Sequence, residues 1–153
     1  MIEETLVMYG GGAEGAARRM LPKLPDGCFA PVDLDALGEA AGRGLRQVVL
    51  VAGMADQAAI VGPVLGEITA AMAGGAAGGD ALAAEVAAAD AAADPERAYA
   101  LWESAGRLGP CGRELCRRTA GELERRAGSV AAQVVLVDAA GERMVGMFGR
   151  MAR

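Results

Sequence analysis

The sequence contains no histidine among its 153 residues. Without an imidazole, the chain by itself cannot form a Ser-His-Asp or Cys-His catalytic arrangement, and it cannot bind a metal ion through histidine. Any catalysis must use carboxylates, thiols, hydroxyls, the two tyrosines, or a bound cofactor that supplies the reactive group. The lack of histidine therefore limits the catalytic mechanisms that the chain could use, and the sequence identifies no catalytic residue.

Cysteines and aromatic residues are scarce. The three cysteines, Cys28, Cys111 and Cys116, contain no C-x-x-C pair, and an odd number of them fits neither a disulfide framework nor a zinc site. We expect structural thiols and no metal site. A lowered thiol pKa at Cys111 and Cys116, near the start of a predicted helix, is the alternative. Aromatics make up 3% of the chain and hydrophobic residues 53%, so small aliphatic side chains must form a closely packed core.

Long apolar runs and an excess of positive charge are also absent. No segment reaches the roughly 18 to 20 uninterrupted apolar residues that a membrane-spanning helix needs. The N-terminus opens acidic and resembles neither a signal peptide nor a transit peptide. With 15 basic and 20 acidic side chains, the net charge of −5 argues against binding to a nucleic-acid backbone. We therefore expect a cytoplasmic protein with no nucleic-acid or membrane partner.

Apolar runs alternate with helical patterns in the first half of the chain. The predicted strands are 5–8, 28–32 and 47–52. The predicted helices are 13–21, 34–45 and 56–72, the last with a kink or break at Pro63. This order is typical of a parallel sheet with right-handed crossovers, and the unbroken run QVVLVA at 47–52 indicates its buried centre.

The second half is rich in alanine and helical, and it ends in a strand pair. Helices are predicted to begin at Asp80, Pro95 and Pro110. Residues 133–137 and 143–148 are expected to form a hairpin. The fold prediction is a single α/β domain over 1–153: a Rossmann-like parallel sheet flanked by helices, an alanine-rich helical segment and a C-terminal strand pair, with a candidate hinge at 73–79. Exposed helices and an edge hairpin make a homo-oligomer plausible.

The glycine-rich stretch YGGGAEG, residues 9–15, follows the first predicted strand. Gly10, Gly12 and Gly15 fit G-x-G-x-x-G, but a chain with 23 glycines produces this spacing easily by chance. In open α/β sheets ligands bind beyond the carboxyl ends of the strands, so residues 10–12, Asp33 or Asp35, and residues 53–56 should meet there.

Each of these residues also has a purely structural interpretation. The acid about 20 residues after the glycines is placed to bind the ribose of a dinucleotide or of S-adenosylmethionine, or else to cap a helix. Glu14 either stabilises the start of a helix, or it orders the glycine loop or accepts a hydrogen bond from a ligand. Trp102 is predicted to be a core or interface anchor. The arginines of 113–126 are expected on a solvated helix face, and Met144, Met147 and Met151 on a hairpin face or at an interface.

Several segments resemble the C-terminal half of the CbiD family, the cobalt-precorrin-5B C-1 methyltransferases of anaerobic cobalamin biosynthesis. In that family a strand leads into a T-G-G-x-[ST]-E-like loop, which Gly10, Gly11 and Glu14 match. The D-F-V-G-x-A-like segment corresponds to 29–32 followed by 35–40, and the strand with a V-G-[HM]-x-G-K-like turn corresponds to 48–57. The D-x-x-G of the closing strand is at 138–141.

The chain also departs from the family pattern. Ala55 and Gln57 replace a glycine and a lysine after the third strand, Ala13 replaces a polar loop residue, and only Thr69 of a T-H pair remains. The family's N-terminal domain has no counterpart in the sequence.

The resemblance implies methyl transfer that depends on S-adenosylmethionine, directed to a ring carbon of a cobalt-precorrin. The residues expected to bind this cofactor are Gly10, Gly11, Gly12, Glu14, Asp35, Gly53 and Met54. The implied partners are a corrinoid intermediate or a separately encoded N-terminal CbiD-like chain. The alternative is a non-catalytic binding or scaffold domain that keeps the fold and has lost the chemistry.

Overall fold

The computed structural model describes residues 4–73, 77–128 and 130–151, and within them the chain forms one five-stranded sheet. Its strands are β1 (Thr5–Tyr9), β2 (Phe29–Pro31), β3 (Gln47–Ala52), β4 (Ala131–Val137) and β5 (Met144–Gly149), in the order β2-β1-β3-β4-β5. β2, β1, β3 and β4 are parallel, and β5 pairs antiparallel with β4. The predicted α/β fold and the C-terminal strand pair are confirmed.

Alternating side chains of the central strands form two separate apolar layers. One face carries Val7, Val49, Val51, Val135 and Val137, which pack with Ala13, Ala16 and Ala17 at helix α1 (Glu14–Met20). The other face carries Met8, Val48, Leu50, Val134 and Leu136, which belong to the larger core. Every residue of β3 is buried, as its unbroken apolar run predicts for a strand covered on both faces.

The remaining helices begin within two residues of the predicted positions, but the one that begins at Leu34 ends at Ala41 and not at Leu45 as predicted. They are α2 (Leu34–Ala41), α3 (Met54–Val61), α4 (Leu65–Ala73), α5 (Gly79–Ala91), α6 (Pro95–Ser104) and α7 (Leu108–Ala127). Pro63 marks a full break between α3 and α4, and Pro95 is in the first turn of α6. α7 begins two residues before Pro110, because a proline is tolerated within the first helical turn. Asp33 caps α2 by accepting from two backbone N–H groups.

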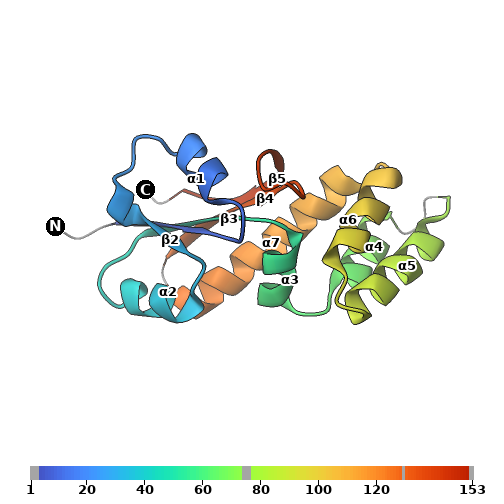
Figure 1. The fold of residues 1–153 in the computed structure, drawn as a ribbon. Helices are drawn as coiled ribbons and strands as arrows, with labels where there is room; N and C mark the ends of the chain where they lie inside the picture. The colour runs from blue at the N-terminus through green and yellow to red at the C-terminus, as the bar shows by residue number, and fades with distance from the viewer. Residues whose placement is uncertain (1–3, 74–76, 129, 152–153) are drawn as a thin grey trace.

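Helices α4, α5 and α6 form a helical extension beyond the carboxyl ends of the strands, and the long α7 connects it to the sheet (Figure 1). Trp102 is fully buried there, and its Nε1–H donates to Thr69 Oγ1 at 2.8 Å. The Thr69 hydroxyl in turn lies 2.7 Å from Leu65 O. Trp102 is therefore a core anchor, as predicted, and Thr69 serves packing within the extension. Of the expected hinge at 73–79, residues 74–76 lie outside the described residues.

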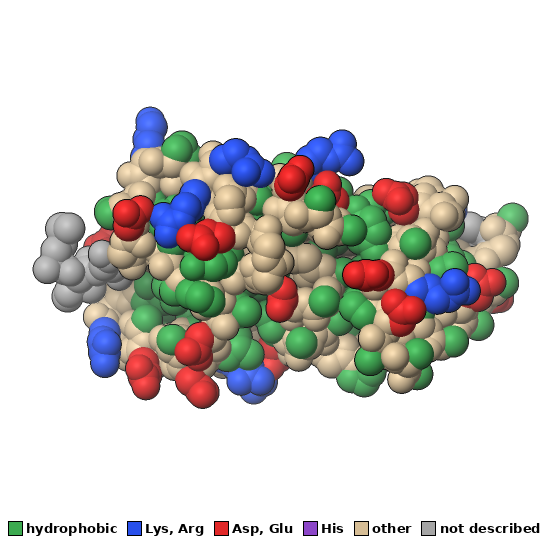
Figure 2. Space-filling view, in the orientation of Figure 1, with side chains coloured by type: hydrophobic (Ala, Val, Ile, Leu, Met, Phe, Trp, Pro, Cys, Tyr) green, Lys and Arg blue, Asp and Glu red, His purple; other side chains and the backbone are tan. Residues whose placement is uncertain are grey.

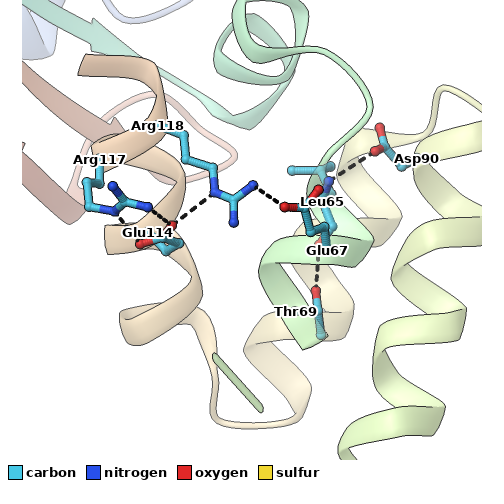
Figure 3. A network of polar contacts seen from close by, with 7 residues as sticks. All are labelled: Leu65, Glu67, Thr69, Asp90, Glu114, Arg117 and Arg118. Atoms are coloured by element: carbon cyan, nitrogen blue, oxygen red, sulfur yellow. Dashed lines mark hydrogen bonds and ion pairs between the residues drawn. The ribbon is translucent and has the colours of Figure 1, made fainter. Parts of the chain in front are cut away.

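An ionic cluster joins α7 to α4 (Figure 3). Glu114, whose side chain is 10% exposed, accepts two hydrogen bonds from Arg117 (2.7 and 2.6 Å) and one from Arg118 (2.9 Å). Arg118 also donates to Glu67 on α4 at 3.0 Å. Hydrogen bonds from Arg117 and Arg118 lower the pKa of Glu114 to about 2. The arginines expected on a solvated face thus include two that hold a buried carboxylate.

The outermost strand leaves methionines in solvent. Met144 and Met147 on β5 are 54% and 44% exposed, and Met151 beyond it is 58% exposed. On the face shown in Figure 2, charges of both signs are scattered among apolar side chains. Across the described ranges, no helix combines the length and the apolar character needed to cross a membrane.

We expect the Glu114 cluster to make stability depend on pH. The pKa of Glu114 is lower in the folded chain than its ordinary value of 4.5, so its contribution is present above about pH 5 and is lost as the pH falls towards 2. Glu114→Gln should lower the free energy of unfolding at pH 7, because it removes the charge that Arg117 and Arg118 stabilise. We expect a loss of only about 1–3 kcal/mol, because solvent screens the half-exposed Arg117. Urea unfolding between pH 7 and pH 3 measures this.

The difference between Glu114→Gln and the unaltered protein should shrink on acidification. Glu39→Gln removes the same charge from an exposed site on α2 and should leave stability nearly unchanged. An equal loss in both variants, or a difference independent of pH, would contradict this role of Glu114.

Candidate functional site

The point where the chain reverses direction across the sheet lies between β1 and β3. From β1 the chain moves to β2 on one side, and it then returns to β3 on the other side. In parallel α/β sheets, ligands bind beyond the carboxyl ends of the strands at such a switch point. The residues that follow β1 and β3 here are the glycine loop, residues 10–12, and the start of α3.

Asp56 on α3 holds the glycine loop against the end of β3. Its Oδ2 accepts a hydrogen bond from Gly11 N–H at 3.1 Å, while Gly10 N–H donates to Val51 O at 2.9 Å. A Cβ on Gly10 would lie 2.3 Å from Asp56 Oδ2, so the Asp56 carboxylate would have to shift to make room for it. A side chain at position 10 would therefore disturb the contact between Asp56 and the loop.

A second turn, residues 138–141 after β4, packs directly on the glycine loop. Gly141 is buried with φ +75°, and a Cβ there would lie 2.4 Å from Gly12 O. The Asp138 carboxylate accepts from the backbone N–H groups of Glu142 (3.0 Å) and Arg143 (3.4 Å), and these bonds lower its pKa. We call this segment the closing turn. It corresponds to the predicted D-x-x-G.

A hollow lies between the two turns and α6, with an empty volume of about 620 Å³ that is partly open to solvent. Its walls are Gly11, Gly12, residues 53–56, Pro95, Glu96, Tyr99 and residues 137–141. Three of these residues, Asp56, Glu96 and Asp138, are acidic, and none is lysine or arginine. Burial raises the pKa of Tyr99, so its hydroxyl stays protonated at neutral pH. The hollow thus offers carboxylates and a phenol, but no cation.

A shallower depression lies on the other side of the glycine loop. It is lined by residues 9–12, Glu14, Gly15, Pro31 and Val32. Glu14 here accepts a hydrogen bond from Arg18 at 3.0 Å along its own helix, and Arg18 also pairs with Asp26 at 2.8 Å. The Glu14 carboxylate is therefore already engaged in a surface ion pair.

The structure brings most of the expected cofactor-binding residues together. Gly11, Gly12, Gly53 and Met54 line the hollow, Gly10 lies behind it against Asp56, and Glu14 lines the shallower depression. Asp35 lines neither of them: it is exposed in the first turn of α2, where its N–H donates to Asp33 Oδ1. Their role in binding a ligand remains a prediction.

Neither α6 nor the closing turn was expected to contribute to the site. The position of the closing turn after a parallel strand was a usable signal, since the carboxyl ends of parallel strands share one edge. The contribution of Glu96 and Tyr99 had no such signal, because it depends on how the helical extension packs.

Gln57, where the resemblance leads us to expect a lysine, has a structural role. It is fully buried, and its Nε2 donates to Ala52 O at 3.2 Å and to Val135 O at 3.3 Å. The Thr119 hydroxyl on α7 lies 3.0 Å from Gln57 Oε1. This side chain therefore connects β3, β4 and α7 beneath the hollow and does not line it.

The cysteines are structural thiols. Cys111 and Cys116, both on α7, are fully buried in the larger hydrophobic core, and Cys28 is 6% exposed. Burial raises the pKa of Cys111 to about 11 and that of Cys116 to about 12. The alternative of a lowered thiol pKa is wrong, because desolvation outweighs the lowering effect of Arg107 on Cys111 and of hydrogen bonds on Cys116.

We expect the native thiols to resist modification. At pH 8 the folded protein should react with Ellman's reagent at less than one thiol per chain over an hour, because the thiols are buried and protonated. All three should react rapidly in guanidinium. Rapid reaction of one thiol in the folded protein would show that a cysteine is accessible.

The same substitution should have different effects on the stability of the fold at two neighbouring glycines of the loop. Gly10→Ala should destabilise the fold by about 1–3 kcal/mol, because the added Cβ collides with Asp56. Gly11→Ala should change stability little, since a Cβ there meets no atom within 4 Å. Thermal unfolding of the two variants measures the contrast, and equal effects would show that Asp56 does not restrict the loop.

Comparisons with known proteins give two matching relatives. No protein-family model matches the chain, and no solved structure matches it significantly. A cobalt-precorrin-5B C(1)-methyltransferase of Salinispora arenicola is 38% identical over 171 residues, and the protein of the same name from Salinispora tropica is 39% identical. Each alignment covers 99% of this chain and 43% of the relative.

The chain thus spans less than half the length of the curated relatives that it matches. The resemblance predicted from the glycine loop, the buried strand and the closing turn is confirmed by these alignments over nearly the whole chain. Over nearly its whole length the chain is therefore similar to part of the cobalt-precorrin-5B C(1)-methyltransferases of the two Salinispora species.

Proposed function

We propose that this chain provides the S-adenosylmethionine site for methyl transfer to a cobalt-precorrin ring carbon in cobalamin biosynthesis. The observation that carries the proposal is the hollow at the switch point, which is lined by two glycine-containing turns and three carboxylates. The chain that forms it is similar to two proteins named cobalt-precorrin-5B C(1)-methyltransferase. The names of the relatives imply the cofactor, and the chemistry of the hollow is consistent with it.

The residues of the hollow fit such a ligand. S-adenosylmethionine has a positively charged sulfonium, which a nearby carboxylate stabilises. It also has two ribose hydroxyls, which can donate hydrogen bonds to carboxylates. Glu96 and Asp56, whose Oδ2 also accepts from Gly11 N–H, are the candidates, whereas the Asp138 carboxylate accepts two backbone hydrogen bonds in its own turn. The missing side chains at Gly11, Gly12 and Gly53 let a ligand approach the backbone closely.

The residues of the chain would act by binding and orientation. When bound, the cofactor supplies an electrophilic methyl group, so the protein has to align this group with the carbon nucleophile and exclude water. Asp56 and Glu96 would hold the ribose and the positive charge. Met54 and Val137 give the hollow an apolar wall, and Tyr99 can donate a hydrogen bond from its protonated hydroxyl.

The corrinoid substrate requires more than this hollow. It is a large molecule with several acidic side groups, and no lysine or arginine lines the hollow. We therefore propose that a protein equivalent to the rest of the relatives, more than half of their length, completes the substrate site. Methyl transfer to cobalt-precorrin-5B should then require that partner, whereas binding of the cofactor should not.

A non-catalytic binding domain is the second candidate. The observation that favours it is Gln57, a buried structural side chain at the position where the family resemblance leads us to expect a lysine. Transfer of labelled methyl from S-adenosylmethionine, with and without the partner, separates the two. Cofactor binding without transfer in both cases would support the second candidate.

Filling the hollow should block cofactor binding. Gly53→Leu places a side chain where a Cβ meets no atom within 4 Å, so the fold should be kept while the ligand is displaced. The affinity for S-adenosylhomocysteine, measured by calorimetry, should fall at least tenfold. Gly38→Leu is the matched control, because it adds the same side chain on α2 in open space outside the hollow. Absence of binding to the unaltered protein at millimolar ligand would refute the proposal.

A further inference from the structure

We infer that Asp56 determines which ligands the hollow accepts: its carboxylate occupies the anion position of the glycine loop, so the site takes nucleosides and rejects ligands with a phosphate there. This rests on the proposed function in one respect, namely that an adenosine group binds in the hollow. It adds a residue and a selectivity that neither the fold nor the relatives specify.

The glycine loop lies where parallel α/β proteins commonly bind phosphate. There, backbone N–H groups that follow the first strand point at a ligand anion, and a helix N-terminus adds favourable potential. In this chain the Gly11 N–H is already bonded to Asp56 Oδ2 at 3.1 Å. An internal carboxylate therefore takes the place of the external anion.

The loop is shaped around this carboxylate. A Cβ at Gly10 would lie 2.3 Å from Asp56 Oδ2 and 2.9 Å from its Cγ, so the loop closes over Asp56 in this conformation because position 10 has no side chain. Asp56 is in the first turn of α3, which follows β3, so its position is set by the strand next to β1. The carboxylate is thus held in the loop from the neighbouring strand.

The charges nearby do not offset Asp56. Glu96 and Asp138 line the same hollow, and no lysine or arginine does. Three arginines near the two turns have other partners than Asp56: Arg18 pairs with Glu14 and Asp26, Arg19 donates to Glu142 O, and Arg143 pairs with Asp138. A phosphate placed at the loop would meet a carboxylate and no compensating cation, which is unfavourable at short range.

Two ligands that differ by one phosphate test the inference. Calorimetry compares adenosine with adenosine 5′-monophosphate on the unaltered protein and on Asp56→Asn, which keeps an oxygen to accept from Gly11 N–H. The unaltered protein should bind adenosine at least tenfold more tightly than the monophosphate. In Asp56→Asn this ratio should fall at least fivefold, through tighter binding of the monophosphate.

Two further variants separate charge from shape. Asp56→Glu keeps the charge and should keep the rejection of the monophosphate. Asp80→Asn removes one negative charge from the exposed first turn of α5 and should leave the ratio unchanged. An equal change of the ratio in Asp56→Asn and Asp56→Glu would overturn the inference, because shape alone would then explain it.

The outcomes also distinguish the inference from the proposed function. If adenosine and S-adenosylhomocysteine bind but the ratio is the same with and without the Asp56 charge, the selectivity role is wrong and the cofactor site stands. If the unaltered protein binds the monophosphate as tightly as adenosine, the inference is likewise wrong. If no nucleoside binds to any of the proteins, both fail.

Discussion

The buried Gln57 side chain is the contact on which the arrangement of the site depends. Its amide joins the ends of β3 and β4, and its oxygen lies beside Thr119 of α7. α7 runs on to the helical extension, so the contact indirectly sets where α6 lies over the strand ends (Figure 1). No buried side-chain nitrogen or oxygen in the described part of the chain lacks a hydrogen-bond partner. A polar side chain in this core is thus tolerated because all its bonds are made.

Local chemistry explains which parts of the fold the sequence could predict. The strands β1 and β3 have unbroken apolar runs, and Pro63 and Pro95 mark helix ends by backbone geometry alone. The packing of α4, α5 and α6 was not predictable, because α5 is mostly alanine and shows almost no difference between its faces. The walls that α6 adds to the hollow therefore had no sequence signal, whereas the glycine loop and the start of α3 did.

Paired acids show the same limit at the level of single residues. Asp33 and Asp35 both precede or begin a helix, and only the cap geometry shows that Asp33 receives the backbone N–H groups. In the sequence Asp56 looks like an ordinary acidic residue in the first turn of a helix, yet its carboxylate accepts a hydrogen bond from Gly11 in the loop that follows β1. Contacts between residues 45 positions apart follow from the sheet order, which the pattern of one sequence does not fix.

The closing turn and the glycine loop are in contact through backbone atoms. Gly141 faces the carbonyl of Gly12 with no room for a side chain, so neither turn can change its path unless the other moves with it. Side-chain contacts can be repaired by a second substitution at the partner position, but a contact between two backbones offers no such compensation. Position 141 should therefore remain glycine, and inserted residues are more readily accommodated at the ends of the helical extension than in either turn.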